Sequence, residues 1–210
     1  IEGGARCGYI NPDQITFAYL KGRQNAPNEK NWMQAVQWWE SLCSNETAVF
    51  DDEVHFDATQ ISPTVTWGIT PAQNISIDEN TPLLQSLKNG ERLIAQEAFS
   101  YMEINPGEPI RGLPVDVCFI GSCTNGRISD LRAAAKVAKG KHVAEGIKAF
   151  VVPGSEQVAK TAKEEGIHHI FLEAGFEWRE PGCSMCLAMN PDKLEGKQIS
   201  ASYTNRNFKG

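Results

Sequence analysis

The sequence predicts an α/β fold in three layers, with a mostly parallel sheet and helices on both of its faces. Two apolar stretches, residues 115–120 and 147–152, lack clean alternation, as expected of strands buried on both faces. A segment with helical spacing follows each of them, so strand and helix alternate along the second half of the chain. The content of 41% hydrophobic and 22% charged residues is that of a folded globular protein.

The first half of the chain is predicted to contain shorter elements. Asn31 precedes apolar residues at helical spacing up to Leu42, so we expect a helix that Asn31 caps. Residues 54–58 alternate between apolar and polar side chains and predict a strand. The other expected elements are a strand over residues 64–66, a helix over residues 82–88 that ends at Gly90, and a helix over residues 91–102.

A cluster of turn-forming residues divides the chain. Residues 105–109 read Asn-Pro-Gly-Glu-Pro, and Pro114 follows closely. We place a domain boundary there, with an α/β domain over residues 1–105 and a second α/β domain over residues 106–210. In the second domain we expect strands over residues 115–120, 147–152 and 176–178, with a loop over residues 121–126 after the first strand. We expect three helices there: one over residues 128–138, stopped by Gly140, one from the cap Ser155 to Gly166, and one over residues 167–174, stopped by Gly175.

Charge and hydropathy exclude several classes of protein. The formal net charge is −6, whereas nucleic-acid binders usually carry an excess of basic residues, so no nucleic-acid partner is expected. No apolar run approaches the roughly 18 residues that span a bilayer, and no membrane partner is expected. No secretory signal is recognisable, so we expect a cytoplasmic location.

Three of the six cysteines fall in loops that follow predicted strands. Cys123 follows the strand that ends at residue 120, and Cys183 and Cys186 form a C-x-x-C motif after the strand near residue 178. Reactive groups in open α/β sheets gather at the carboxyl ends of strands, so adjacent strands would bring these thiolates together. Cys118 lies inside a predicted strand and is expected to be an inert core residue.

Three converging thiolates are compatible with more than one kind of site. Zinc would need a histidine or an open position as its fourth ligand. A redox dithiol would use Cys183 and Cys186 alone and leave Cys123 unexplained. An iron–sulfur cluster held by three cysteines leaves one iron without a protein ligand, and that iron can act as a Lewis acid. The spacing favours zinc and a cluster about equally, since a single C-x-x-C motif has low specificity.

Both cysteine motifs resemble those of a known family. Residues 119–127 (Phe-Ile-Gly-Ser-Cys-Thr-Asn-Gly-Arg) closely resemble the signature loop of the aconitase family. Residues 180–190 (Glu-Pro-Gly-Cys-Ser-Met-Cys-Leu-Ala-Met-Asn) resemble the second signature as found in the large subunits of the isopropylmalate dehydratases, a branch of that family. Residues 1–6, 17–23, 65–68 and 202–208 resemble the same branch, so the similarity runs from end to end.

The resemblance implies an aconitase-like fold and a hydro-lyase. It implies a 4Fe-4S cluster on Cys123, Cys183 and Cys186, easily lost in air, with Glu2 as a catalytic residue. Asn205 and Arg206 are implied to bind the substrate. The implied reaction interconverts 2-isopropylmalate and 3-isopropylmalate by dehydration and rehydration, in leucine biosynthesis. Metal coordination suits this reaction because hydroxide is a poor leaving group. Ser122, Thr124 and Asn125 are further candidates, as donors of hydrogen bonds to cluster sulfurs.

The resemblance also implies a partner and a missing part. The catalytic serine of the family belongs to a separate small subunit, which would form a heterodimer or heterotetramer with the large one. The family's large subunit is much longer than this chain, so the first domain is expected to be truncated at its N-terminus. We therefore expect no isomerase activity from these 210 residues alone. The alternatives are the large subunit of a homoaconitase or citraconate hydratase, a zinc-binding structural module, or a folded fragment without a function of its own.

Overall fold

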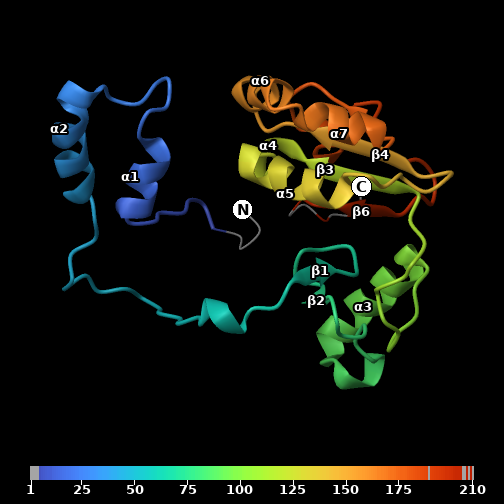
Figure 1. Cartoon of the computed structure of the whole chain (residues 1–210). Coiled ribbons are helices and arrows are strands. Elements are labelled where there is room, and N and C mark those ends of the chain that lie inside the picture. Colours follow the sequence, from blue (N-terminus) through green and yellow to red (C-terminus); the bar gives the residue numbers. More distant parts are fainter. Residues whose placement is uncertain (1–4, 189, 205–206, 208, 210) are drawn as a thin grey trace. The chain divides into compact units, whose positions relative to one another are not determined.

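The computed structural model describes residues 5–188, 190–204, 207 and 209. The chain forms two compact units, Ile1–Ala58 and Thr59–Gly210 (Figure 1). The predicted domain boundary after residue 105 falls in the loop that leads from the last helix before the sheet to its first strand, and it stays a prediction. Among the described residues, no helix has both the length and the apolar character needed to cross a membrane.

The described part of the first unit contains two helices, α1 (Gln14–Leu20) and α2 (Glu29–Glu40). Phe17 of α1 is buried and stacks on Trp39 of α2, with ring centroids 5.8 Å apart. The predicted cap Asn31 is wrong, because the side chain of Asn28 accepts a hydrogen bond from the Asn31 backbone N–H and α2 begins at residue 29. The capping residue and the first apolar residue of the pattern are therefore a full turn apart.

The strand predicted over residues 54–58 is also wrong. Residues 54–57 have no regular secondary structure, and η1 (Ala58–Gln60) is a single 3-10 turn. Val54 and Phe56 are exposed, and no described strand pairs with this segment. Alternation alone cannot make a strand when the backbone donors and acceptors lack a neighbouring strand.

The first part of the second unit consists of a small sheet and a helix. β1 (Thr64–Thr66) pairs with β2 (Asn74–Ser76) in antiparallel fashion, and Trp67 stacks on Phe99 of α3 (Asn89–Met102) with centroids 4.6 Å apart. The predicted strand over residues 64–66 and the predicted helix over residues 91–102 are confirmed. The helix predicted over residues 82–88 is wrong, because the structure has only the 3-10 turn η2 (Leu84–Ser86) there. Lys88 is extended and precedes α3, so Gly90 lies in the first turn of α3.

A parallel four-stranded sheet forms the centre of the second unit. Its strands are β3 (Val117–Gly121), β4 (Lys148–Val152), β5 (Glu177–Trp178) and β6 (Ser200–Ser202), in the order β5-β4-β3-β6. Every pairing is parallel, with Phe119 opposite Phe150 and Val151 opposite Trp178. This confirms the predicted α/β class. The predicted strands agree with β3, β4 and β5 to within two residues.

The two faces of this sheet are covered differently. Figure 1 shows the helices on one side, and a core cluster joins Val151 to them. They are α5 (Ile128–Ala138), α6 (Glu156–Glu164) and α7 (Ile167–Glu173), close to their predicted bounds. The opposite face buries Phe119 and Phe150 beneath the segment that includes the 3-10 turn η3 (Ser184–Cys186). Within the described residues, helices therefore cover one face of the sheet and the C-x-x-C segment covers the other.

Candidate metal centre at the carboxyl edge of the sheet

The loop that carries Cys123 leaves β3 through an unusual backbone turn. Gly121 has a φ of 106°, and a Cβ atom there would lie 2.0 Å from the carbonyl oxygen of Val152. The next residue, Ser122, has a φ of 78° and begins the short helix α4 (Ser122–Asn125). A non-glycine residue in this region costs on the order of 1–3 kcal/mol, so the fold stabilises a strained turn. Cys123 follows directly and its side chain is exposed.

Two further glycines allow the neighbouring loops to touch through their backbones. The Gly154 N–H donates to the carbonyl oxygen of Gly126 at 2.8 Å. A Cβ atom on Gly126 would lie 2.5 Å from the carbonyl oxygen of Ser122 and 2.6 Å from the Gly154 nitrogen. The loop after β3 and the loop after β4 are therefore locked together at the carboxyl edge. Beneath them the Ser122 hydroxyl is buried, and no described residue is its hydrogen-bond partner.

The second cysteine motif forms a tight turn after β5. The Cys186 N–H donates to the Cys183 carbonyl oxygen at 3.0 Å, and Ser184 between them has a φ of 46°. Cys183 is exposed, whereas Cys186 is half-buried and packs with Met185 against the buried face of β3 and β4. The motif therefore presents one sulfur to solvent and keeps the other near the sheet.

An ionic network supports this turn. The Ser184 hydroxyl donates to Asp192 Oδ2 at 2.7 Å, and Arg179 Nε and Nη2 donate to Asp192 Oδ1 at 3.2 and 3.1 Å. Arg179 Nη1 also lies 2.7 Å from Glu177 Oε2. Burial raises the pKa of Asp192, but the hydrogen bonds from Ser184 and Arg179 and the charge of Arg179 outweigh it, so this pKa is lowered from its ordinary value. Asp192 is therefore an anion that both partners hold in place.

The three predicted ligands share an edge of the sheet without forming a gathered set. Cys123 follows β3 and the cysteine pair follows β5, with β4 between these strands. Among the described residues, no group of three or more His, Cys, Asp or Glu side chains is placed so that it could hold a metal ion. The donor set still fits an iron–sulfur group in its chemistry, since all three side chains are thiols on loops that leave one edge. Their role as ligands stays a prediction.

The predicted residues Glu2, Asn205 and Arg206 lie outside the described residues. Residues on both sides of the Asn205–Arg206 pair are described and anchored. Asn125 Nδ2 donates to the Tyr203 carbonyl oxygen at 2.6 Å, and Asn207 Nδ2 donates to the Gly68 carbonyl oxygen at 2.7 Å. The segment is thus tied on one side to the Cys123 loop and on the other to the turn after β1.

Sequence reasoning missed several of these residues. Asn125 was expected to act toward cluster sulfurs, but its amide binds the backbone of the C-terminal segment instead. The sequence analysis predicted no role for Arg179, Asp192 or Asn207. The one local signal for Asp192 was its Asn-Pro-Asp sequence, which is typical of a turn, six residues beyond the second cysteine of the pair.

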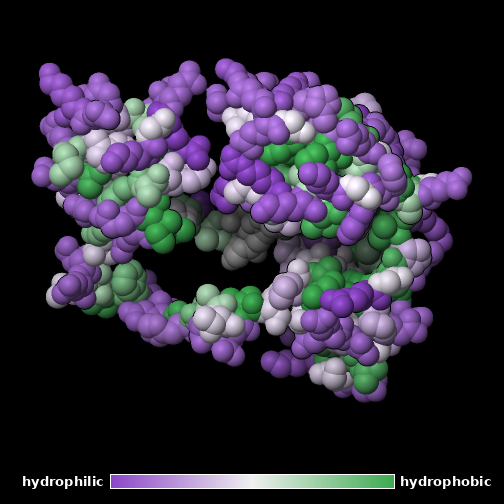
Figure 2. Space-filling model, in the orientation of Figure 1, coloured by the Kyte–Doolittle hydropathy of each residue, from purple (hydrophilic) through white to green (hydrophobic). Residues whose placement is uncertain are grey.

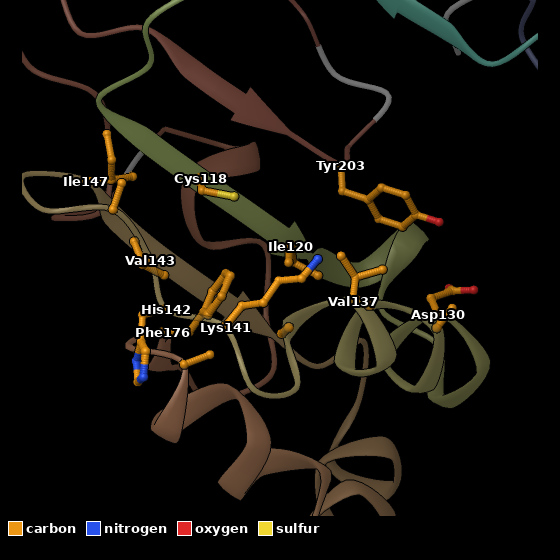
Figure 3. Close-up of a pocket in the computed structure, with 15 residues that line it drawn as sticks. Cys118, Ile120, Asp130, Val137, Lys141, His142, Val143, Ile147, Phe176 and Tyr203 are labelled. Atoms are coloured by element: carbon orange, nitrogen blue, oxygen red, sulfur yellow. The ribbon is translucent and has the colours of Figure 1, made fainter. Parts of the chain in front are cut away.

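A cavity of about 600 Å³ lies between β3 and α5 (Figure 3). Cys118 and Ile120 of β3 form its floor, Val137 of α5 lies on one side, and Tyr203 also lines it. Cys118 was expected in the core, but it is half-buried and lines this cavity, and burial raises the pKa of its thiol. None of the three predicted ligands lines this cavity. Figure 2 shows hydrophobic surface over α5 and α7, where Val137 and Leu172 are exposed.

The chain is thus an α/β protein with cysteine-bearing loops at the carboxyl edge of a parallel sheet, and comparison with known proteins identifies its family. The chain matches the Aconitase family (aconitate hydratase) over residues 1–210 and belongs to it. It is 70% identical over 210 residues to the 3-isopropylmalate dehydratase large subunit of Parasynechococcus marenigrum (strain WH8102) and covers 44% of that protein.

Two other relatives with the same name have nearly the same sequence identity to the chain. The chain is 68% identical over 210 residues to the large subunit of Prochlorococcus marinus (strain MIT 9303), of which it covers 44%. It is also 68% identical over 210 residues to that of Acaryochloris marina (strain MBIC 11017), of which it covers 45%. The chain therefore spans less than half the length of these relatives.

Proposed function

We propose that this chain is part of the large subunit of a 3-isopropylmalate dehydratase. This hydro-lyase interconverts 2-isopropylmalate and 3-isopropylmalate by dehydration and rehydration, in the leucine pathway. The observation that carries the proposal is the position of both cysteine motifs at one edge of one parallel sheet. Identity of 70% over all 210 residues to a relative of that name supports the same function.

The proposed cofactor is a 4Fe-4S cluster on Cys123, Cys183 and Cys186. Bound there, it would supply a Lewis acid that stabilises the negative charge of a departing hydroxyl group. The residues of the chain position the cysteine ligands. The strained turn at Gly121 and Ser122 directs Cys123 outward. The carboxylate of Asp192 accepts a hydrogen bond from Ser184, which lies between the two cysteines of the pair.

Substrate binding is assigned to the C-terminal segment. The planar guanidinium of Arg206 suits a bidentate contact with a substrate carboxylate, and Asn205 adds an amide beside it. A local cation is required because the chain has a net charge of −6 and the substrate is a dianion. The anchors on Tyr203 and Asn207 support this role, since they tie the segment to the Cys123 loop and to Gly68. Glu2 is proposed as a catalytic residue.

A partner completes the proposal. Relatives of this chain are named large subunits, and we propose that a small subunit binds this protein and contributes the remaining catalytic serine. We place the assembly in the cytoplasm. The 210 residues alone should not turn over isopropylmalate, and measurable turnover by them would contradict this. Homoaconitate and citraconate derivatives, assayed beside isopropylmalate on the complete assembly, separate the proposed substrate from those of neighbouring enzymes.

Anaerobic reconstitution tests the cofactor. The chain is incubated with ferrous iron and sulfide, and bound iron and acid-labile sulfide are measured together with the visible absorption spectrum. We expect about four irons and four sulfides per chain, and a loss of most of both in Cys123→Ser. Cys7→Ser is the matched control, since Cys7 is an exposed cysteine outside both motifs. Full iron and sulfide in Cys123→Ser would refute the ligand assignment, and zinc without sulfide would favour the zinc-binding module.

A further inference from the structure

We propose that Asp192 and Arg179 are positioning residues for the cysteine pair. Through Ser184 they hold the turn from Cys183 to Cys186 in one conformation, which fixes how the two sulfurs lie relative to each other. The cysteine pair is part of the metal site of the proposed function, and the inference rests on that function to this extent. The hold on the turn itself is a property of this chain that is measurable without any cluster.

The turn needs an external support. It is a single 3-10 turn of three residues, and Ser184 has a φ of 46°, in the left-handed region that favours glycine. Cys183 at its start is exposed. A short turn with a strained residue does not hold its shape alone, so an interaction from outside the turn has to select this conformation.

Asp192 supplies that interaction with both of its oxygens. Oδ2 accepts from the Ser184 hydroxyl at 2.7 Å, while Oδ1 accepts from Nε and Nη2 of Arg179. The side chain of Asp192 is only 13% exposed, so water competes weakly for these bonds. Ser184 is the residue directly after the first cysteine of the pair, and fixing its side chain therefore fixes the turn.

Arg179 connects this carboxylate to the rigid sheet. Its backbone N–H donates to the Val151 carbonyl oxygen at 2.9 Å, continuing the pairing of β5 with β4. Its guanidinium carbon lies 4.6 Å from the ring centroid of Phe150, a residue that is almost fully buried. A planar group stacked on a core ring has little freedom to move. The order of support is thus sheet, Arg179, Asp192, Ser184 and then the two sulfurs.

Glu177 provides the matched comparison within the same network. Its carboxylate lies 2.7 Å from Nη1 of Arg179, and Glu177 is a residue of β5, outside the turn that carries Ser184. Removing the charge of Glu177 perturbs the same arginine but leaves the bond to the turn in place. A general effect of losing an ion pair would appear in both variants, whereas an effect on the turn would appear only when Asp192 changes.

The test measures how well the two sulfurs act together when no metal is present. Phenylarsine oxide bonds one arsenic to two neighbouring thiols, and its affinity is measured by competition with a small dithiol under anaerobic conditions. The full chain carries Cys7→Ser, Cys43→Ser and Cys123→Ser so that the pair is the target. We expect Asp192→Ala to weaken binding by about tenfold, in the range seen for residues that support metal ligands. Asp192→Asn, which keeps an acceptor for Ser184, should recover part of the loss.

The controls separate the turn from the fold. Glu177→Gln should stay within about twofold of the parent affinity, and thermal unfolding of each variant is recorded. If Asp192→Ala does not fold, Ser184→Ala removes only the bond to the turn and should give a similar loss. Equal affinity of the parent and a folded Asp192→Ala or Ser184→Ala chain would overturn the inference.

To distinguish this inference from the proposed function, cluster formation is measured on a parent chain that keeps all its cysteines, with and without Asp192→Ala, because Cys123→Ser removes a proposed ligand. A parent chain that takes up no iron and sulfide, together with a tenfold loss of arsenical affinity in Asp192→Ala, supports the positioning role and refutes the cluster. A parent chain that forms the cluster, together with unchanged arsenical affinity in the variants, supports the cluster and refutes the positioning role. A parent that forms the cluster while Asp192→Ala loses both cluster and affinity supports both.

Discussion

Two serines next to predicted ligands lie in the left-handed region of the backbone. Ser122 precedes Cys123 with a φ of 78°, and Ser184 follows Cys183 with a φ of 46°. Backbone strain of this kind persists only where the surroundings determine it, and it gathers at functional sites. Different interactions stabilise the two strained conformations. Close backbone contacts at neighbouring glycines surround Ser122, whereas Ser184 donates a hydrogen bond to the carboxylate of Asp192.

The first prediction concerns the glycine at the end of β3. Gly121→Ala should destabilise the second unit by about 2–4 kcal/mol, because the new Cβ adds a clash to an unfavourable φ. The clash partner is the Val152 carbonyl oxygen, 2.0 Å from the Cβ position. Gly140→Ala is the matched control, since Gly140 has a φ of 72° but nothing within 4 Å of its Cβ position. It should cost only about 1–2 kcal/mol in urea unfolding, and equal costs for both variants would contradict the close-contact argument.

The second prediction concerns the amide that holds the C-terminal segment. Asn125→Ala removes the 2.6 Å bond to the Tyr203 carbonyl oxygen and should cost about 1 kcal/mol in urea unfolding. Asn74→Ala serves as the comparison, because its amide donates to the Pro71 and Ala72 carbonyl oxygens of its own turn. Hydrogen exchange of the Tyr203 N–H, which donates to the Phe119 carbonyl oxygen, should become faster only in Asn125→Ala. Unchanged exchange there would mean that Asn125 does not anchor the segment.

At the scale of elements, local signals predicted three of the four strands of the sheet and the helices α5, α6 and α7, whereas β6 and the short helix α4 were not predicted. β3 and β4 are apolar runs, and α5 and α7 end at predicted glycines, Gly140 and Gly175, that adopt positive φ values. Such signals act within a few residues and do not depend on the rest of the fold. The prediction of a strand over residues 54–58 was wrong because a strand needs a neighbouring strand to pair with, and local alternation does not provide one.

The third prediction concerns the ion pair between α5 and the end of α6. Arg132 Nε donates to Glu165 Oε2 at 2.8 Å, and this hydrogen bond lowers the pKa of the Glu165 carboxyl below its ordinary value of 4.5. A lowered carboxyl pKa in the folded state gives stability that is present above the unfolded pKa and is lost as pH falls through the folded value. Arg132→Gln should therefore lower the unfolding temperature at neutral pH and leave it nearly unchanged in strong acid.

The pH series has its own control. Lys160→Gln removes an exposed ion pair within α6, where the distance to Glu164 is 3.9 Å. It should change the unfolding temperature little at any pH, since such long exposed pairs contribute little. An Arg132→Gln effect of the same size in acid and at neutral pH would show that packing of the side chain, and not its charge, matters.

At the scale of the whole molecule, the sequence could place the cysteine motifs but not their supports. Cys123 and the cysteine pair follow strands that the sequence predicted, and parallel strands end at one edge, so a shared edge was predictable. The bond from Asp192 to Ser184 and the bond from Asn207 to Gly68 depend on tertiary folding. The second of them joins residues 139 positions apart, which no local pattern encodes.

The last prediction follows from the division of the chain into two units. All three proposed ligands belong to Thr59–Gly210 and none belongs to Ile1–Ala58. A group that binds only the folded state stabilises the part whose folding creates its site. Anaerobic reconstitution should therefore slow hydrogen exchange in β3 and β4. We expect exchange to be slower by tenfold or more when the concentration of the metal group is about ten times its Kd. Exchange in α2 should not change, because its unit supplies no ligand.

Chelation provides the reverse experiment on the same sample. Removing iron with a chelator should return exchange in β3 and β4 to the rate of the unreconstituted chain. Cys186→Ser should show no slowing at any stage, because two thiols remain where three are required, whereas Cys43→Ser should behave as the parent does. Slower exchange in α2 that matches that of β3 would contradict the assignment, since it would mean that the metal group engages the unit without the proposed ligands.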